Sequence, residues 1–82
     1  MTVSPNPLSG SAQIAFSLSG REHVTAALLD VLGRPMLTIA DASFDGGSHS
    51  LSLDATALRP GTYYLRLETT AGHLTKKLVV TR

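Results

Sequence analysis

The sequence contains no cysteine and no tryptophan, and its only aromatic residues are two tyrosines and two phenylalanines among 82 residues. Without cysteine, neither a disulfide bond nor a thiolate zinc site can stabilise the fold. A chain this short buries only about 60–65% of its unfolded surface, so most of its apolar side chains are needed for one core. Little apolar surface remains to line a deep substrate cavity, and we expect no enzymatic activity.

Long hydrophobic runs are also missing. No uncharged apolar stretch reaches the about 18 residues that a membrane-spanning helix requires, so we expect no membrane insertion. The start, Met1–Pro5, lacks the basic and apolar segments of a signal peptide. Strand and turn signals run from end to end without a linker or repeat, and we expect one domain over residues 1–82, excised from a larger protein.

Charged residues make up only 16% of the chain, and the two signs are unevenly distributed. Residues 1–58 hold two basic and five acidic side chains, a net charge of −3, whereas residues 59–82 hold five basic and one acidic, a net charge of +4. A basic segment can mark a binding face, or it can reflect the charged edges of one sandwich. We do not expect nucleic-acid binding, because Tyr63 and Tyr64 are adjacent and face opposite sides of a strand, where they form no common stacking platform.

Apolar and polar residues alternate in short segments, as in strands that bury one face. We expect strands over residues 12–18, 24–28, 36–40, 49–53, 63–68 and 74–81, the first two paired antiparallel with each other. Tyr63, Leu65 and Leu67 should face inward. On the last strand we expect Leu78 and Val80 inside. Six or seven short strands at this spacing are typical of a β-sandwich.

Two connections and the N-terminus have distinct signals. Residues 41–47 are polar and contain a glycine pair, which predicts a loop. Residues 54–58 predict a single helical turn capped by the Asp54 carboxylate. A short strand around Val3 is expected only at a sheet edge, because Pro5 and Pro7 cannot donate ladder hydrogen bonds.

Several polar residues have structural explanations. Asp30 should accept backbone N–H bonds within its own turn, where Gly33 supplies a positive φ, so we interpret Asp30, Gly33 and Arg34 as a structural turn. The inward-facing Tyr63 should place its hydroxyl on a backbone group. The adjacent pair Lys76–Lys77 would block unwanted sheet pairing if the last strand lies at an edge.

The chain offers little chemistry. His23, His49 and His73 stand next to strand starts or hairpins, with no pair at short spacing on one strand face, so we expect no metal site and no cofactor. There is no Gly-x-Ser-x-Gly nucleophile elbow. The spacing of the six acidic residues gives no cluster suited to acid–base catalysis.

Several segments, taken in order, resemble one family. They are Pro5-Asn6-Pro7, Ile14–Leu18, Asp30–Arg34, the run from Gly47 to Leu53, Leu58–Leu67 and the closing segment Lys76–Arg82. Their order and spacing resemble the type A C-terminal sorting domain of type IX secretion, the system that Bacteroidetes and their relatives use to carry proteins across the outer membrane. The resemblance covers nearly the whole chain.

The resemblance implies a seven-stranded immunoglobulin-like sandwich fused behind an unrelated cargo. Its implied partners are the secretion translocon in the periplasm and a sortase-like peptidase at the cell surface, and its implied destination is the cell surface or the medium. The family's signal is concentrated in the last strands. It maps onto Gly61, Tyr63, Arg66, Lys76, Lys77, Val79, Val80 and Arg82.

An alternative is a spacer or carbohydrate-binding accessory module of a secreted enzyme with the same fold. Position within the parent protein separates the two interpretations. A sorting domain ends the parent chain, whereas a spacer or sugar-binding module can be followed by further sequence.

Overall fold

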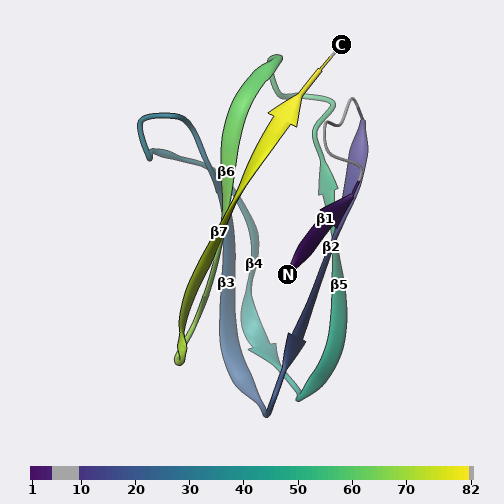
Figure 1. The fold of residues 1–82 in the computed structure, drawn as a ribbon, viewed down its shortest axis with the longest axis vertical. Helices are drawn as coiled ribbons and strands as arrows, with labels where there is room; N and C mark the ends of the chain where they lie inside the picture. The colour runs from purple at the N-terminus through teal and green to yellow at the C-terminus, as the bar shows by residue number, and fades with distance from the viewer. Residues whose placement is uncertain (5–9, 82) are drawn as a thin grey trace.

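Seven strands in two antiparallel sheets make up the fold in the computed structural model (Figure 1). The structure describes residues 1–4 and 10–81. The strands are β1 (Thr2–Ser4), β2 (Ser11–Leu18), β3 (Glu22–Leu29), β4 (Pro35–Phe44), β5 (Gly47–Asp54), β6 (Gly61–Thr69) and β7 (Gly72–Val80). One sheet has the order β1-β2-β5 and the other the order β4-β3-β6-β7. The predicted immunoglobulin-like β-sandwich of seven strands is confirmed.

The core lies between the two sheets and takes alternate residues from each strand. Along β2 and β3 every second side chain is buried, as the period of two predicts. The inward faces predicted for the last two strands are confirmed. Tyr63, Leu65 and Leu67 are at most 8% exposed, and Leu78 and Val80 at most 3%. The segment to which the resemblance assigns the sorting signal therefore also contributes to the core.

The first two long strands, β2 and β3, do not pair with each other, and that prediction was wrong. β2 pairs with β1 and β5, whereas β3 pairs with β4 and β6. The segment Ser19–Arg21 therefore crosses from one sheet to the other. The crossover lets the apolar faces of the two strands bury each other, and Phe16 of β2 shares a core cluster with Val24 of β3.

The third long strand is longer than predicted. Residues 41–44, predicted as part of a loop, continue β4, which leaves Asp45 and Gly46 as the connection to β5. The Asp41 carboxylate contacts His23 on the neighbouring strand, and Phe44 packs edge to face on Phe16 with 5.6 Å between ring centroids. Because β4 is a mostly exposed edge strand, it lacks the apolar alternation that sequence reading detects.

The predicted helical turn over residues 54–58 is a turn without helix. Asp54 caps no helix but organises this turn, because its Oδ1 accepts hydrogen bonds from the Thr56 amide (3.0 Å) and hydroxyl (2.7 Å). These two bonds, the amide first, lower the pKa of Asp54 below its ordinary value. The Leu58 amide donates to the Ala55 carbonyl, which closes a single turn. A lone turn is too short to propagate as a helix.

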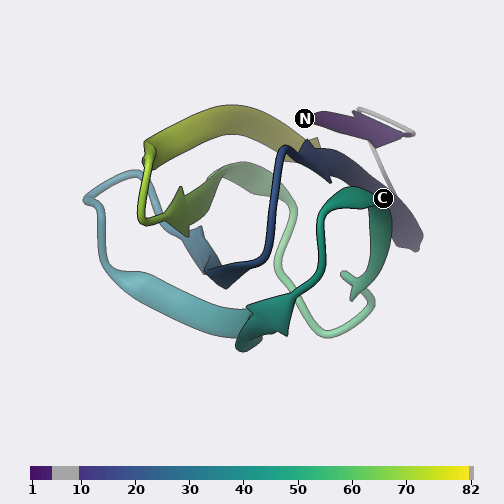
Figure 2. The same cartoon turned by 90° about the horizontal axis from the view of Figure 1, so that it is seen from below.

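The edges of the two sheets lie in pairs along the sides of the sandwich. β1 and β7 run along one side, and β4 and β5 run along the other (Figure 2). The edge position predicted for a strand around Val3 is confirmed for β1, whereas Pro5 and Pro7 lie outside the described residues. The edge position of β7 gives Lys76 and Lys77 the setting in which lysine opposes unwanted sheet pairing.

The turn between β3 and β4 is organised by Asp30, as predicted. Its Oδ1 accepts hydrogen bonds from the Leu32 and Arg34 amides, both 2.9 Å, and its Oδ2 accepts one from Arg34 Nε at 2.8 Å. Gly33 has a φ of 82°, which an L side chain rarely adopts. The hydrogen bond from the Arg34 amide is the main reason that the pKa of Asp30 lies below its ordinary value.

Neutralising Asp30 tests this turn. Because the fold lowers the pKa of Asp30 from its ordinary value of 3.8, the ionised form stabilises the fold above that pH. The stabilisation is lost as the pH falls through the lowered folded-state pKa. We expect the Asp30→Asn variant to lose less stability between about pH 4 and pH 2 than the unsubstituted protein, because asparagine does not titrate. Thermal unfolding followed by circular dichroism measures this, and identical pH dependence of Tm in both proteins would contradict it.

Candidate functional site

The hairpin formed by β6 and β7 carries the residues that the sequence singles out. The two strands pair over their full length, from Gly61 opposite Val80 to Thr69 opposite Gly72. β6 lies inside the four-stranded sheet, and β7 is its edge strand. A partner can therefore reach the hairpin from the outer face of the sheet or along the β7 edge.

Two of the predicted recognition residues are part of the core. Tyr63 is buried, and its hydroxyl donates a 2.7 Å hydrogen bond to the Arg59 carbonyl, which confirms the predicted backbone contact. A tyrosine near the start of this strand, bonded to the backbone a few residues upstream, is the tyrosine corner of immunoglobulin-like sandwiches. Val80 is buried opposite Gly61, the first residue of β6. The buried side chains of Tyr63 and Val80 therefore offer a partner no direct contact.

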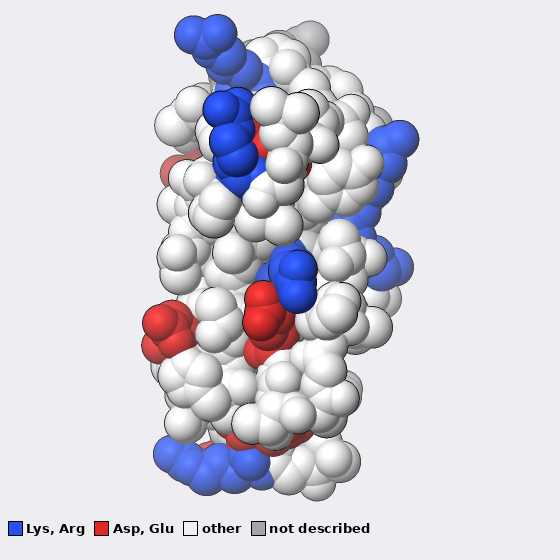
Figure 3. All heavy atoms as spheres, turned by 90° about the vertical axis from the view of Figure 1, so that its left-hand side faces the viewer, with Lys and Arg blue, Asp and Glu red and all other residues white. Residues whose placement is uncertain are grey.

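Arg66 lies on the outer face of β6, where it is half-buried. Across the sheet it stands opposite Ala27 on one side and Thr75 on the other. Its Nε lies 2.9 Å from Glu68 Oε1 but is shielded from water and makes no hydrogen bond, so the contact with Glu68 is an ion pair of imperfect geometry. Figure 3 looks onto this side of the molecule, and uncharged side chains cover most of the surface.

Lys76 and Lys77 project from opposite faces of β7. Lys76 stands opposite the buried Leu65 and so belongs to the inward-facing row, whereas Lys77 stands opposite the outward-facing Tyr64. Both lysines are nevertheless exposed. An inward-facing residue can be exposed here because β7 is the edge strand of its sheet and its first six residues are exposed. One partner can contact both ammonium groups only if it approaches the edge of β7.

The structure describes one of the two remaining predicted residues, Val79, which lies near the end of β7. Val79 is half-buried on the outer face, opposite Thr62. Arg82 lies outside the described residues. The structure thus brings Arg66, Lys77 and Val79 to one face of the hairpin and Lys76 to the other.

Sequence reading missed one residue of this hairpin. Leu74 stands opposite Leu67 on the inward-facing row but is 55% exposed. It borders a hollow of about 250 Å³ between β7 and β2. The sequence did contain a signal for this residue. Leu74 and Lys76 belong to the same alternating row, and a lysine in that row indicates that this part of β7 is not buried in the core.

His23 and His49 contact different residues. His23 contacts the Asp41 carboxylate, whereas His49 Nε2 lies 2.6 Å from the Asp45 carbonyl oxygen. Within residues 1–4 and 10–81, no group of three or more histidine, aspartate or glutamate side chains could hold a metal ion. The same residues include no helix long and apolar enough to cross a bilayer.

The sequence was compared with models of protein families, and one of them matches. A family model described as "Secretion system C-terminal sorting domain" matches residues 2–81. The matched range takes in all seven strands. Neither the curated proteins nor the solved structures gave a match. Since the family model matches almost the whole chain, the protein belongs to the family of C-terminal sorting domains that direct export across the outer membrane through the type IX secretion system.

Proposed function

We propose that residues 1–82 act as one sorting domain at the C-terminal end of a larger secreted protein. The domain performs no catalysis, and a cargo fused ahead of it carries the activity. The observation that supports this most directly is the family match over residues 2–81, which includes both strands of the β6–β7 hairpin. The proposed partners are the type IX translocon, met in the periplasm, and a sortase-like peptidase at the cell surface that cuts ahead of the domain.

The proposed receptor contact is made along the edge of β7. Lys76 and Lys77 flank that edge from its two faces, and Arg66 lies on the outer face of the neighbouring strand. Their charge attracts an acidic groove in the receptor and raises the rate of encounter. Backbone groups of an edge strand then offer short-range recognition by strand addition. Gly61, Tyr63, Val79 and Val80 hold the hairpin in this form, and Arg82 adds to the positive charge of the sequence segment 59–82.

The spacer or carbohydrate-binding alternative has weaker support. Sugar-binding faces of sandwiches stack aromatic rings on the ligand. The outer face of the four-stranded sheet offers Tyr64, which is half-buried between Leu29 and Lys77. One partly covered ring is a poor sugar platform, so the sorting function is preferred.

A reporter fusion tests the proposed function. The chain is joined behind a periplasmic reporter in a bacterium with a working type IX system, and the reporter is assayed in the medium, at the cell surface and in the periplasm. We expect it at the surface or in the medium, and in the periplasm of a strain without the translocon. A reporter retained in the periplasm of both strains, with the domain intact by protease resistance, would refute the proposal.

A further inference from the structure

The three-stranded sheet is incomplete at one end of β2. On one side β5 pairs with all eight residues of β2, from Ser11 to Leu18. On the other side β1 pairs only with Gln13, Ala15 and the residue between them. Among the described residues, Phe16–Leu18 thus have a strand neighbour on the β5 side alone.

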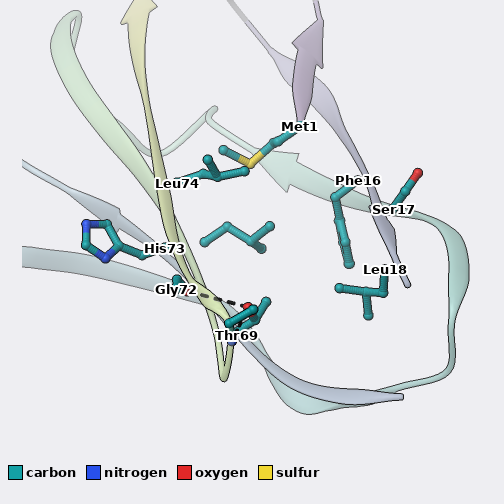
Figure 4. A pocket seen from close by; sticks show the side chains of 10 residues that line it. Met1, Phe16, Ser17, Leu18, Thr69, Gly72, His73 and Leu74 are labelled. Carbon is teal, nitrogen blue, oxygen red and sulfur yellow. Dashed lines mark hydrogen bonds between the residues drawn. The ribbon is translucent and has the colours of Figure 1, made fainter. Parts of the chain in front are cut away.

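Two hollows flank this stretch of β2. The first, of about 250 Å³, lies between the sheets and is lined largely by apolar side chains, including Phe16, Leu18, Leu67 and Leu74 (Figure 4). The second, of about 320 Å³, is lined partly by the outward-facing Ala15, Ser17 and Ser48. Side chains of a strand alternate between faces. A strand added beside Phe16–Leu18 would therefore fill both hollows, with apolar residues in the first and small polar residues in the second.

The direction of β1 indicates where such a strand would come from. Met1 lines both hollows and packs against both core clusters. In Figure 4 it lies at the start of β1, between Leu74 on the β7 side and Phe16 on the β2 side. Thr2 stands opposite Ala15, so the antiparallel register puts Met1 opposite Phe16. A residue joined ahead of Met1 would come opposite Ser17, and the one before it opposite Leu18.

We infer that, in the precursor, the linker that joins the cargo to the domain continues β1 and pairs with Phe16–Leu18. This inference rests on the proposed function, because it needs a cargo ahead of Thr2. A linker already tethered to β1 reaches the site at high effective concentration and closes no new loop, which favours it over a strand from another molecule. The residue opposite Leu18 is apolar and enters the inner hollow, where it covers Leu74. The residue opposite Ser17 is small or polar.

A disulfide test measures this register directly. The chain has no cysteine, so an added pair is the only one present. One cysteine is placed immediately ahead of Met1 in a chain extended by a short linker, and the second is Ser17→Cys on the exposed face of β2. Directly opposite residues of antiparallel strands have Cβ atoms about 4.5–5.5 Å apart, close to the about 3.5–4.5 Å of a disulfide, so a small shift of the strands lets the bond form. We expect several-fold faster intramolecular crosslinking than in a control with the same upstream cysteine and Ser48→Cys, which lies one strand further away.

Hydrogen exchange supplies a readout without cysteines. A linker with an apolar residue two positions ahead of Met1 should slow exchange at the amides of Phe16–Leu18 that face away from β5. A linker of the same length with prolines at these positions should not, because proline cannot complete the ladder. The exchange comparison decides between pairing and no pairing even if the cysteine variants fail to fold.

The outcomes of these experiments show whether the linker, a second copy of the chain or no strand pairs with Phe16–Leu18. Equal crosslinking rates for the Ser17 and Ser48 pairs, or equal exchange with both linkers, would overturn the inference. Crosslinking between two molecules would assign the edge to a second copy of the chain and would also overturn it. The measurements use purified protein, so a failure of export in the reporter assay leaves their result unaffected, and the reverse holds as well.

Discussion

Replacing Leu78 by alanine is expected to lower the free energy of unfolding by about 3 kcal/mol. Leu78 is fully buried in the core cluster that includes Tyr63, its neighbour across the β6–β7 hairpin. A buried Leu→Ala change loses transfer free energy and leaves a cavity, at a cost of about 2–5 kcal/mol. With 82 residues the whole fold is stabilised by roughly 4–12 kcal/mol, so a large share would be lost. Urea unfolding followed by circular dichroism gives the value.

Leu74 provides a matched control for this substitution. It lies on the same strand and in the same inward-facing row, but it is 55% exposed. Leu74→Ala therefore removes the same atoms from a largely hydrated position and should cost under about 1 kcal/mol. Equal losses in the two variants would show that the C-terminal half of β7 is not the buried half.

The burial of Leu78 affects how truncations of the sorting signal are interpreted. Deleting Leu78–Arg82 should leave a fused cargo in the periplasm, but it also removes Leu78 and Val80 from the core. Loss of export then reports unfolding and lost recognition together. Recognition is separated from folding only by substitutions at exposed positions, of which Lys76 and Lys77 are the clearest on β7.

The sequence predicts those parts of the fold in which one face of a strand is buried and the other is not. Tyr63, Leu65 and Leu67 alternate with polar or partly exposed residues, and β6 has the predicted faces. The Asp30 turn was also predictable, because an aspartate that accepts amides of its own turn is a local arrangement. Both features depend on residues close together in the chain.

Features that depend on contacts between distant segments were not predictable. The turn residues around Gly20 mark a change of direction, but they do not say whether the chain returns to the same sheet or crosses to the other. The extension of β4 past Ala40 is stabilised by its neighbours, including the contact of Asp41 with His23, and not by alternation. The two hollows beside β2 lie next to the part of β2 beyond Ala15, with which β1 does not pair, and no local pattern records this.

In the candidate site, too, local features were predictable from the sequence and features that depend on distant contacts were not. The basic segment and its position in the last strands could be identified from the sequence. That Lys76 and Lys77 lie on opposite faces follows from the period of two, but their joint exposure does not. Their joint exposure results from the edge position of β7. The first half of this strand is not buried in the core, and Leu74 is exposed there as well.

Reversing both lysine charges is expected to reduce export of a fused reporter by about tenfold or more, without unfolding the domain. Electrostatic steering raises association rates by about 10–1,000-fold, and the Lys76→Glu/Lys77→Glu variant replaces attraction by repulsion at an acidic receptor. Both side chains are exposed, so we expect the free energy of unfolding to change by less than about 0.5 kcal/mol. Reporter activity in the medium and in the periplasm measures export, and circular dichroism of the purified variant checks the fold.

Two control variants separate the charge at this edge from other causes. Lys76→Arg/Lys77→Arg keeps the charge and should preserve export, whereas loss of export there would mean that the ammonium groups make specific contacts. Arg21→Glu reverses an exposed charge that pairs with Asp45 and lies on the connection between β2 and β3, outside the β6–β7 hairpin, and it should leave export unchanged. If the glutamate pair exports the reporter as well as the unsubstituted domain does, steering by Lys76 and Lys77 is wrong, and recognition has to be sought in the backbone edge of β7 or on the outer face around Arg66.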